Sequence, residues 1–350
     1  MEKKQFNPND IAASDGTIFG LPFTADEAAI VLLPVPWDVT VSYRDGASKG
    51  PQTILDASVQ VDLYDPLIKD SWKIGLAMEN PFPKIISMNK VLRKKASAFI
   101  RNLEKGISGS VPAMKKNQHE VNAGCLELKK IVKKLAEDQF RKNKFVGLVG
   151  GDHSTPLGFI EALSDRYSEF GILQIDAHCD LRKAYEGFEY SHASIMYNAL
   201  KLPQVKKLVQ VGIRDWCDEE NDYINSSNGR VKTFFDYLLK QQQYEGRTWK
   251  NICEDIVTSL PKNVYISFDI DGLDPKLCPN TGTPVPGGLE FEQVVYLMKS
   301  IVLSGKKIIG FDLNEVAPGE SDWNGNVGAR LLYKMCGFAA VSNGLAKWSK

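Results

Sequence analysis

The chain has 350 residues, and its 43 basic and 43 acidic side chains give a formal net charge of zero. Bulk electrostatic attraction therefore favours neither a nucleic acid nor an anionic membrane as a partner, and no apolar run is long enough to span a bilayer. A hydrophobic fraction of 43% supports a large core. Met1 to Asp10 is polar and lacks the apolar segment of a signal peptide, which predicts a cytoplasmic protein.

Short apolar runs alternate with longer helical patterns along the chain. In chain order, the runs that predict strands are 29–33, 145–149, 171–175, 208–212, 264–268 and 308–311. They are almost continuously apolar, as parallel strands covered on both faces are. Helical patterns are clearest at 291–304 and at about 327–341. This alternation predicts an α/β fold with a mostly parallel sheet. We expect one domain over residues 1–350, with an N-terminal extension at about 1–28 and a helical insertion at about 88–144.

The predicted insertion at 88–144 is rich in lysine, but acidic residues are interspersed with the basic ones. This mixture favours solvated helix faces over a nucleic-acid surface. Two apolar stripes predict helices here, namely Val91, Leu92, Phe99, Ile100 and Leu103 in the first and Leu128, Ile131, Val132 and Leu135 in the second. Residues 106–124 between them are predicted to form a loop, with His119 as a surface residue.

Six cysteines are spread along the chain, and no two of them form a Cys-x-x-Cys pair. An even number of cysteines does not by itself indicate a disulfide framework in a chain of this length without a secretion signal. We therefore expect reduced thiols. Cys179 stands between two candidate metal ligands, and strand alternation predicts that its side chain points to the opposite face.

Polar side chains gather directly after three of the predicted strands. The segments are Gly150–Ser154, Asp176–Asp180 and Ser267–Gly272. In open parallel sheets the functional crevice lies beyond the carboxyl ends of the strands, so these segments are expected to meet there. Asp176, His178 and Asp180 stand at every second residue, as do Asp269 and Asp271, and this spacing brings the side chains of each segment to one face in extended chain. The candidate metal ligands are His153, Asp176, His178, Asp180, Asp269 and Asp271.

Carboxylates combined with imidazoles suit hard to borderline cations. Mn²⁺ is expected first, and Ni²⁺, Co²⁺ and Zn²⁺ accept the same ligand types. So many carboxylates would repel one another, and two divalent ions roughly 3.5–4 Å apart would offset that repulsion. Such ions also lower the pKa of a shared water, which makes hydroxide available near neutral pH. Any one segment alone could be a hydrogen-bonding cluster; all three at strand ends favour a two-metal site.

With these segments the chain resembles the ureohydrolases, which include arginase, agmatinase, formimidoylglutamase and guanidine hydrolase. The resemblance runs from about Ile30 to Phe338 and rests first on the three ligand segments. The further motifs are Ser42–Gly46 with Gly50-Pro51, Ser191–Ala193, Asp274-Pro275 followed by Gly282–Gly288, and Asp312–Pro318. The resemblance implies a three-layer α/β/α sandwich, a homotrimer or homohexamer, and hydrolysis of a C–N bond in a guanidino compound, which releases urea.

The resemblance also implies roles for individual residues. His153, Asp176, Asp180 and Asp269 resemble the ligands of one manganese, and Asp176, His178, Asp269 and Asp271 resemble those of the other. His192 and Glu315 match the catalytic histidine and the acidic residue that binds the guanidinium, and Asp180 is included among the catalytic candidates. The chemistry agrees, because a carboxylate can take two guanidinium N–H groups and a histidine can assist protonation of the leaving amine.

The substrate is less well defined by the sequence. The segment Leu181–Ser194 should form one wall of the mouth. It lacks the asparagine- and serine/threonine-rich arrangement of arginases and resembles the agmatinase-like branch more closely, a branch taken here to include guanidine hydrolases, which makes arginine less expected. Trp37 and Trp323 are bulky aromatics near these motifs, and they would shorten a pocket that they lined; alternatively they are ordinary core or interface residues. Trp323 and Thr40 are candidate substrate contacts. Free guanidine and an agmatine-type compound both stay open, with a guanidino acid or formimidoylglutamate as further alternatives.

Two other classes of protein fit the residues less well. A deacetylase-like amidohydrolase with a single zinc would carry a tandem His-His pair, and the chain has none. A non-catalytic homologue usually loses metal ligands, and none of the expected ligands is missing here. The sequence therefore predicts an enzyme with two divalent ions in each subunit.

Overall fold

The computed structural model describes residues 6–12 and 16–349. The expected N-terminal extension therefore lies partly outside the described residues, since 1–5 and 13–15 are not among them. The strands are β1 Ile30–Val35, β2 Ile68–Lys69, β3 Leu76–Met78, β4 Phe145–Gly150, β5 Phe170–Ile175, β6 Val205–Ile213, β7 Val231–Phe235, β8 Asn263–Asp269, β9 Lys307–Asn314 and β10 Lys347–Trp348. In the described part of the chain, eight of them form one sheet in the order β3-β1-β4-β9-β8-β5-β6-β7.

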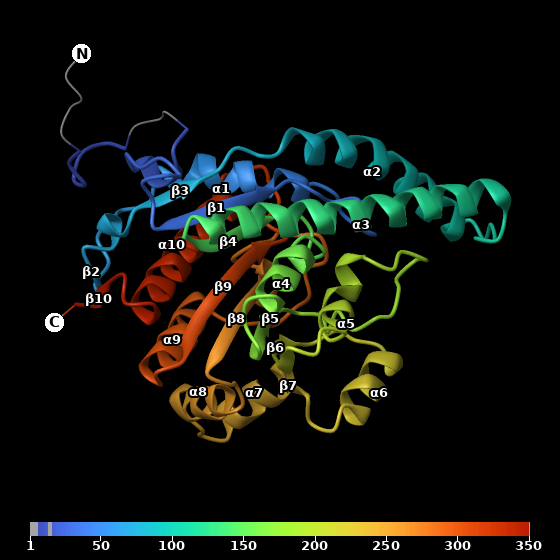
Figure 1. Cartoon of the computed structure of the whole chain (residues 1–350). Coiled ribbons are helices and arrows are strands. Elements are labelled where there is room, and N and C mark those ends of the chain that lie inside the picture. Colours follow the sequence, from blue (N-terminus) through green and yellow to red (C-terminus); the bar gives the residue numbers. More distant parts are fainter. Residues whose placement is uncertain (1–5, 13–15, 350) are drawn as a thin grey trace, which may run out of the picture.

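Every pairing in this sheet is parallel. The helices are α1 Gly50–Ser58, α2 Pro83–Glu104, α3 Pro112–Arg141, α4 Leu157–Ser164, α5 Ile195–Ala199, α6 Asp218–Ser226, α7 Asp236–Tyr244, α8 Trp249–Thr258, α9 Phe291–Leu303 and α10 Trp323–Ser342. Single 3-10 turns are η1 Ile18–Gly20, η2 Ala47–Lys49, η3 Ser71–Ile74, η4 His192–Ser194 and η5 Ile270–Gly272. Figure 1 shows the helices covering both faces of the sheet.

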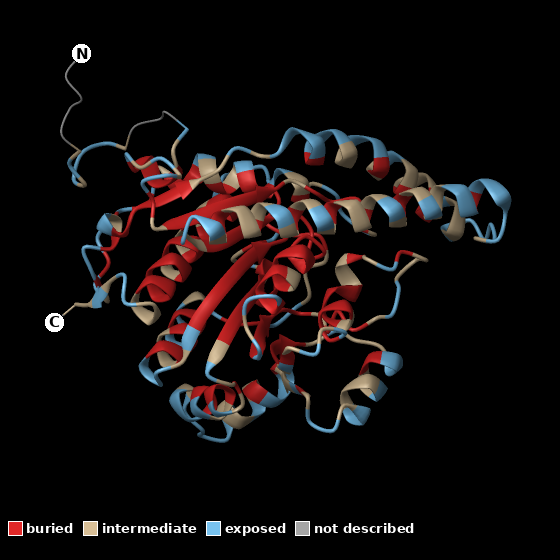
Figure 2. Cartoon of the chain, in the orientation of Figure 1, coloured by how far each residue is buried: buried red, intermediate tan, exposed pale blue. Residues whose placement is uncertain are grey.

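Two hydrophobic cores lie on the two faces of the sheet. One is shared with α1, α8, α9 and α10, and the other with α2, α3, α4 and α5. Strand alternation divides the side chains between them: Val264 and Ile266 of β8 enter the first core, whereas Tyr265 enters the second. Figure 2 shows the strands buried along most of their length. The predicted α/β/α sandwich is confirmed by this three-layer arrangement.

All six predicted strands are present, and each extends to the bounds given above. The predicted helices at 291–304 and 327–341 correspond to α9 and α10, and α10 begins four residues earlier than expected, at Trp323. The sequence did not indicate the edge strands β3 and β7 or the antiparallel pair β2–β10. These are short or carry charged residues, and they lack a continuous apolar run.

The predicted loop at 106–124 is wrong. Helix α3 begins at Pro112, so only a short turn separates it from α2, and His119 is an exposed residue of the helix. The buried stripe of α3 contains Met114, Val121, Cys125, Leu128 and Val132. Its first members stand in a polar stretch, which masked the helical period. On α2, Val91 was predicted in the stripe but is 54% exposed, because the buried face turns through Leu92, Ala96 and Phe99 instead.

Candidate active site

Four neighbouring strands bring the candidate residues together. β4, β9, β8 and β5 are adjacent in the sheet and parallel, so their carboxyl ends meet at one edge. His153 follows β4, Glu315 follows β9, Asp269 ends β8, and Asp176 follows β5. The crevice expected beyond the strand ends is therefore where the polar side chains lie.

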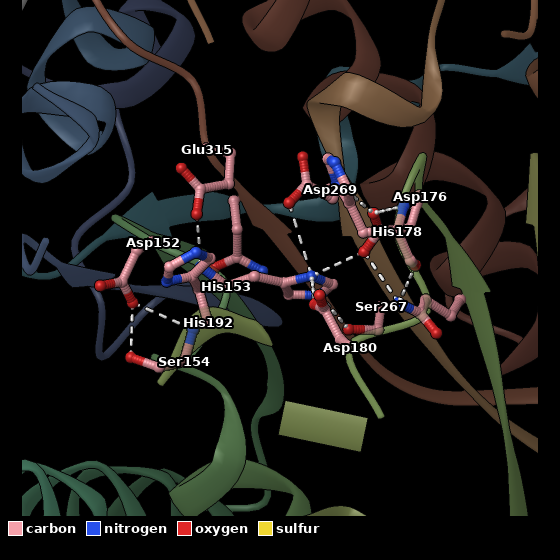
Figure 3. Close-up of polar contacts among 12 residues, drawn as sticks. Asp152, His153, Ser154, Asp176, His178, Asp180, His192, Ser267, Asp269 and Glu315 are labelled. Atoms are coloured by element: carbon pink, nitrogen blue, oxygen red, sulfur yellow. Dashed lines mark hydrogen bonds and ion pairs between the residues drawn. The ribbon is translucent and has the colours of Figure 1, made fainter. Parts of the chain in front are cut away.

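His153 lies among three carboxylates. Its Nδ1 atom is 2.9 Å from Asp176 Oδ2, 3.0 Å from Asp180 Oδ2 and 3.5 Å from Asp269 Oδ2 (Figure 3). His153 is 1% exposed, and among the described residues its Nδ1 has no hydrogen-bond partner of good geometry. A buried imidazole nitrogen that several carboxylate oxygens surround in this way is suited to bind a divalent cation.

A second group surrounds His178. Its Nδ1 is 3.1 Å from Asp271 Oδ2 and 3.6 Å from Asp176 Oδ1. Asp176 thus offers one oxygen to each histidine and belongs to both groups, His153–Asp176–Asp269 and Asp176–His178–Asp271, in which the ligand atoms lie within 4.8 Å of one another. Two adjacent groups that share a carboxylate fit a pair of divalent ions.

The electrostatics of the cluster also fit bound cations. Burial and the charge of Asp176 raise the pKa of Asp180 to about 7, and burial together with the neighbouring carboxylates raises the pKa of Asp269 well above its usual range. Burial also raises the pKa of Asp176, but the interactions of its carboxylate with the nearby His153 and His178 outweigh burial and leave the pKa below the ordinary value. Divalent ions would supply the positive charge that the crowded carboxylates require.

Neighbouring polar groups fix the orientation of the ligands. His153 Nε2 lies 2.9 Å from Ser267 Oγ, whose hydroxyl donates to Asp312 Oδ1 at 3.1 Å. Gln174 Nε2 donates to Asp176 Oδ2 at 2.8 Å. Contacts of this kind hold a metal-binding imidazole in one tautomer and one orientation, which leaves Nδ1 of His153 facing the carboxylates.

The convergence of Asp176, His178 and Asp180 has a different origin from the one expected. β5 ends at Ile175, so this segment lies beyond the strand, and Asp180 has a left-handed φ of 53°. A turn of the chain, and not strand alternation, therefore brings Asp180 to His153. Cys179 packs in the core next to α2–α5, away from the ligands, as predicted.

A pocket of about 400 Å³ opens over the ligand cluster. His178, Asp180 and His192 line it, together with Ser42, Tyr43, Arg44, Arg182, Tyr185, Ala193, Asp215, Trp216, Glu220, Thr283, Pro284 and Val285. The prediction that 181–194 forms one wall is confirmed by Arg182, Tyr185, His192 and Ala193. A larger cavity of about 560 Å³ near Phe82 and Arg141 lies away from the ligands, and the chemistry of the ligand cluster favours the smaller one.

His192 lies in this pocket beside the ring of Tyr185. The two ring centroids are 6.0 Å apart in an edge-to-face arrangement, and the His192 backbone N–H donates to Thr40 Oγ1 at 3.4 Å. Burial, with added repulsion from His178 and His153, lowers the pKa of His192 to about 3. The imidazole is therefore neutral at physiological pH.

Glu315 lies deeper than the pocket wall. It is 6% exposed with a φ of 63°, a strained conformation for a residue other than glycine. Its Oε1 accepts the His153 backbone N–H at 3.0 Å, whereas Oε2 is buried and has no partner within the described ranges. A Cβ on Gly282 would lie 3.4 Å from Oε2. The glycine therefore leaves room beside this carboxylate oxygen for a hydrogen-bond donor.

Comparison with known proteins identifies the family of the chain. The sequence profile described as arginase family matches residues 28–337. The chain belongs to the arginase family. An N(1)-aminopropylagmatine ureohydrolase of Thermus thermophilus is 30% identical over 320 residues, which cover 91% of this chain and 93% of the relative. The agmatinase of Bacillus subtilis (strain 168) is 27% identical over 316 residues, with coverages of 89% and 91%. The predicted ureohydrolase resemblance is thus confirmed.

Solved structures share the fold of this arginase-family chain. The agmatine ureohydrolase of Thermoplasma volcanium superposes with a TM-score of 0.71 at 22% identity, over 95% of this chain and 97% of that one. The arginase of Medicago truncatula gives a TM-score of 0.64 at 21% identity, with coverages of 89% and 87%. These likenesses support the arginase-like sandwich that the motifs implied.

Three residues of the arginase-family chain lie elsewhere than the sequence suggested. Trp37 is fully buried in the core, and Trp323 is 45% exposed at the start of α10, where its indole N–H donates to the Lys276 carbonyl at 3.0 Å. Neither is among the residues that line the pocket, which favours the alternative that Trp37 is a core residue and Trp323 a surface residue. Thr40 is fully buried and also does not line the pocket; it contacts the His192 backbone instead of open space.

Sequence reasoning missed the opposite wall of this family member's pocket. Asp215 and Trp216 line it directly after β6, and Trp216 packs on Phe235 with ring centroids 4.5 Å apart. A signal was available, because 208–212 was predicted as a strand and the residues after its carboxyl end face the same crevice. Tyr43 and Tyr185 add further aromatic surface to the mouth.

Proposed function

We propose that the protein is a ureohydrolase that uses two divalent metal ions to cleave a guanidino compound into urea and an amine. The observation that carries the proposal is the pair of ligand groups sharing Asp176 at the floor of a pocket lined by His192. The reaction adds water to the guanidinium carbon: a C–O bond forms, the C–N bond to the substituted nitrogen breaks, and the amine leaves with a proton.

The residues of this chain supply binding and proton transfer. The free Glu315 oxygen is suited to accept guanidinium N–H groups in a charge-assisted hydrogen bond. His192 lines the pocket, and its imidazole can pass a proton towards the leaving amine. Asp180 lines the pocket and can accept a hydrogen bond from that water. Bound divalent ions supply the lowered water pKa that attack on a delocalised guanidinium requires.

The pocket favours a guanidino compound with an amine tail. Its volume of about 400 Å³ far exceeds that of a guanidinium ion, and the rings of Tyr185 and Trp216 can hold an aliphatic cation. Asp215 adds a carboxylate next to Trp216 in the wall that follows β6. An agmatine-type substrate is therefore proposed, in line with the relatives named agmatinase and N(1)-aminopropylagmatine ureohydrolase. Arg44 and Arg182 also line the mouth, and they favour a guanidino acid as the second candidate.

Manganese is the proposed metal, with nickel as the alternative, because both accept a mixed carboxylate and imidazole ligand set. We further propose a cytoplasmic homotrimer or homohexamer that acts on a small molecule, without a nucleic-acid or membrane partner. All six cysteines lie within the described residues and are free thiols, which suits a reducing compartment. No helix in the described ranges is sufficiently long and apolar to cross a membrane. Light scattering after gel filtration would measure the assembly.

The test is urea release from protein loaded separately with Mn²⁺ and Ni²⁺. The panel contains agmatine, N(1)-aminopropylagmatine, guanidine, arginine, 4-guanidinobutyrate and formimidoylglutamate, with formamide or ammonia assayed for the last. Urea released from a guanidino compound with an amine tail supports the proposal. Urea released from guanidine alone would show that the substrate is short and would contradict the inference from pocket volume. Silence across the panel in protein that binds no metal would contradict the catalytic proposal.

A further inference from the structure

Helices α2 and α3 form a long antiparallel hairpin (Figure 1), and side chains of both helices hydrogen-bond to segments that lie near the pocket. Two segments contact the hairpin, one that lines the pocket and one that lies behind the pocket wall. The first is residues 181–194, here called the mouth loop, and the second is residues 37–41, which contain Thr40. The proposed reaction gives this hairpin no role, although its polar side chains reach both segments.

The mouth loop is held by two amides of α3. Gln118 Nε2 donates to the Gly187 carbonyl at 2.8 Å, and Asn122 Nδ2 donates to the same carbonyl at 3.2 Å. Asn122 Oδ1 accepts the Glu189 backbone N–H at 3.0 Å. Asn122 therefore uses both ends of its amide on the loop. Gly187 has a φ of +80°, and a Cβ there would collide with Gln118, so the close approach requires glycine.

An apolar contact accompanies these hydrogen bonds. Phe188 of the mouth loop is fully buried, and its ring centroid lies 5.3 Å from that of Phe99 on α2. Tyr185 and Phe188 also pair through their backbones, with N–O distances of 3.1 and 2.8 Å. The turn that contains Tyr185 is thus held on the hairpin by hydrogen bonds from α3 and by the ring contact with α2.

The second segment is held by α2. Arg93 Nη1 donates to the carbonyls of Val39 and Val41 at 3.2 and 2.6 Å. Asn89 and Asp38 exchange two hydrogen bonds of 2.9 and 3.0 Å. The guanidinium of Arg93 therefore fixes the residues on either side of Thr40.

Both held segments contact the same group. The ring of Tyr185 meets the ring of His192 edge to face, and Thr40 Oγ1 accepts the His192 backbone N–H. His192 is thereby fixed from two directions by parts of the chain that themselves rest on the hairpin. Orientation of a proton-transferring imidazole matters because an ångström of displacement is enough to slow a reaction strongly.

We propose that the α2–α3 hairpin positions the active site, with Gln118 and Asn122 setting the place of the mouth loop and Arg93 setting that of the Thr40 segment. These three are positioning residues, and the proposal rests on the function proposed above. The mouth loop forms the pocket wall, so Gln118 and Asn122 act on substrate affinity. The Thr40 segment holds the His192 backbone, so Arg93 acts on the rate of the chemical step.

The first experiment compares Gln118→Ala/Asn122→Ala with the wild-type, metal-loaded protein. Hydrogen–deuterium exchange is expected to rise at Tyr185, Phe188 and Glu189, whose backbone amides are protected while Gln118 and Asn122 hold the mouth loop. KM for the tailed substrate is expected to rise about tenfold and kcat to fall by a smaller factor, because the three lost hydrogen bonds hold the pocket wall and Tyr185 of this wall also contacts His192. His119→Ala, at an exposed position on the same helix, is the matched control and should leave both quantities unchanged.

The second experiment uses Arg93→Met, which keeps the apolar stem and removes both hydrogen bonds. Here kcat should fall about tenfold or more while KM changes little, and Arg93→Lys should recover part of the loss because an ammonium can still reach a carbonyl. Metal content and the melting temperature of every variant are measured alongside, so that unfolding is recognised.

The outcomes separate this proposal from the proposed function. Unchanged hydrogen–deuterium exchange in the mouth loop of the double variant overturns the proposal that Gln118 and Asn122 hold this loop, whatever the catalytic activity of the wild type. Raised exchange with unchanged KM and kcat shows a merely structural contact and also overturns it. Absence of urea from the wild-type protein contradicts the proposed function instead, and the exchange data then still report whether the hairpin holds the loop.

Discussion

Ser267 is the residue on which the orientation of the most enclosed histidine depends. It stands between His153 Nε2 and Asp312 Oδ1, with contacts of 2.9 and 3.1 Å. The residue is fully buried, so water cannot readily replace its hydroxyl. An outer hydrogen bond of this kind raises the basicity of the ligand and fixes its ring.

We expect Ser267→Ala to weaken metal binding about 10- to 100-fold, the usual effect of losing a partner behind a metal ligand. Isothermal titration with Mn²⁺ and elemental analysis after dialysis would measure it. Ser300→Ala on α9, where the hydroxyl bonds the carbonyl of Tyr296 at an exposed position, is the control. Equal metal affinity in the two variants would show that Ser267 does not orient His153.

Glu315 presents the opposite situation, because one of its oxygens has no partner among the described residues. We expect Glu315→Gln to lower kcat/KM at least about 30-fold, which corresponds to roughly 2 kcal/mol for losing one charge of a buried pair. The shape is kept, so metal content should stay at the wild-type level. Steady-state urea release and elemental analysis provide the two measurements, and a variant that lost its metal instead would assign Glu315 to the ligand cluster.

At the scale of elements, the mouth loop carries a charge in an unfavourable place. Glu186 has a left-handed φ of 50°, and among the described residues its Oε2 is buried without a partner. Burial and the nearby Glu104 raise its pKa to about 7, against a smaller opposing effect of Arg93. The carboxyl is therefore neutral at acidic pH and becomes charged near neutrality.

The sign of the effect on stability follows from the raised pKa. Below the ordinary pKa near 4.5 the group is neutral in both states; as the pH rises towards 7, only the unfolded state ionises freely, so stability is lost. Glu186→Gln should therefore raise the melting temperature at pH 8 and leave it nearly unchanged at pH 4. Calorimetry at both values checks this, with Glu189→Gln on the exposed side of the loop as the control. A gain that is equal at both pH values would contradict the titration argument.

At the scale of the whole molecule, metal and fold are linked through the strand ends. Asp176, Asp269 and His153 lie at the carboxyl ends of three strands of one sheet, and the two carboxylates repel each other unless cations offset their charge. A ligand that binds only the folded state stabilises it by about 2.7 kcal/mol at a concentration 100 times its dissociation constant.

Removal of metal with a chelator should therefore lower the melting temperature, and Mn²⁺ should restore it in proportion to the logarithm of its concentration. Asp176→Asn, which weakens both ligand groups at once, should lose most of this response. Differential scanning calorimetry with and without EDTA checks the expectation. A melting temperature that does not respond to metal in the wild type would mean that the ligand cluster forms without any energetic need for cations.

The layer architecture and the place of the polar cluster could both be predicted from local sequence pattern. Buried parallel strands need continuous apolar runs, and these runs end where His153, Asp176 and Asp269 begin, so local pattern was sufficient. Edge strands such as β7 carry a weaker pattern, and the start of α3 was hidden because its first turns carry mostly polar residues around the buried Met114.

Tertiary structure alone decided the finer arrangement of the site. That Asp176 is shared by two ligand groups, that Asp180 arrives through a left-handed turn, and that Trp216 faces the pocket while Trp37 is buried all depend on distances between segments far apart in sequence. The same holds for the hairpin, since Asn122 and Gly187 meet only when α3 packs beside the mouth. Spacing along a chain fixes which faces residues share, whereas the packing of helices on the sheet fixes which of those faces meet.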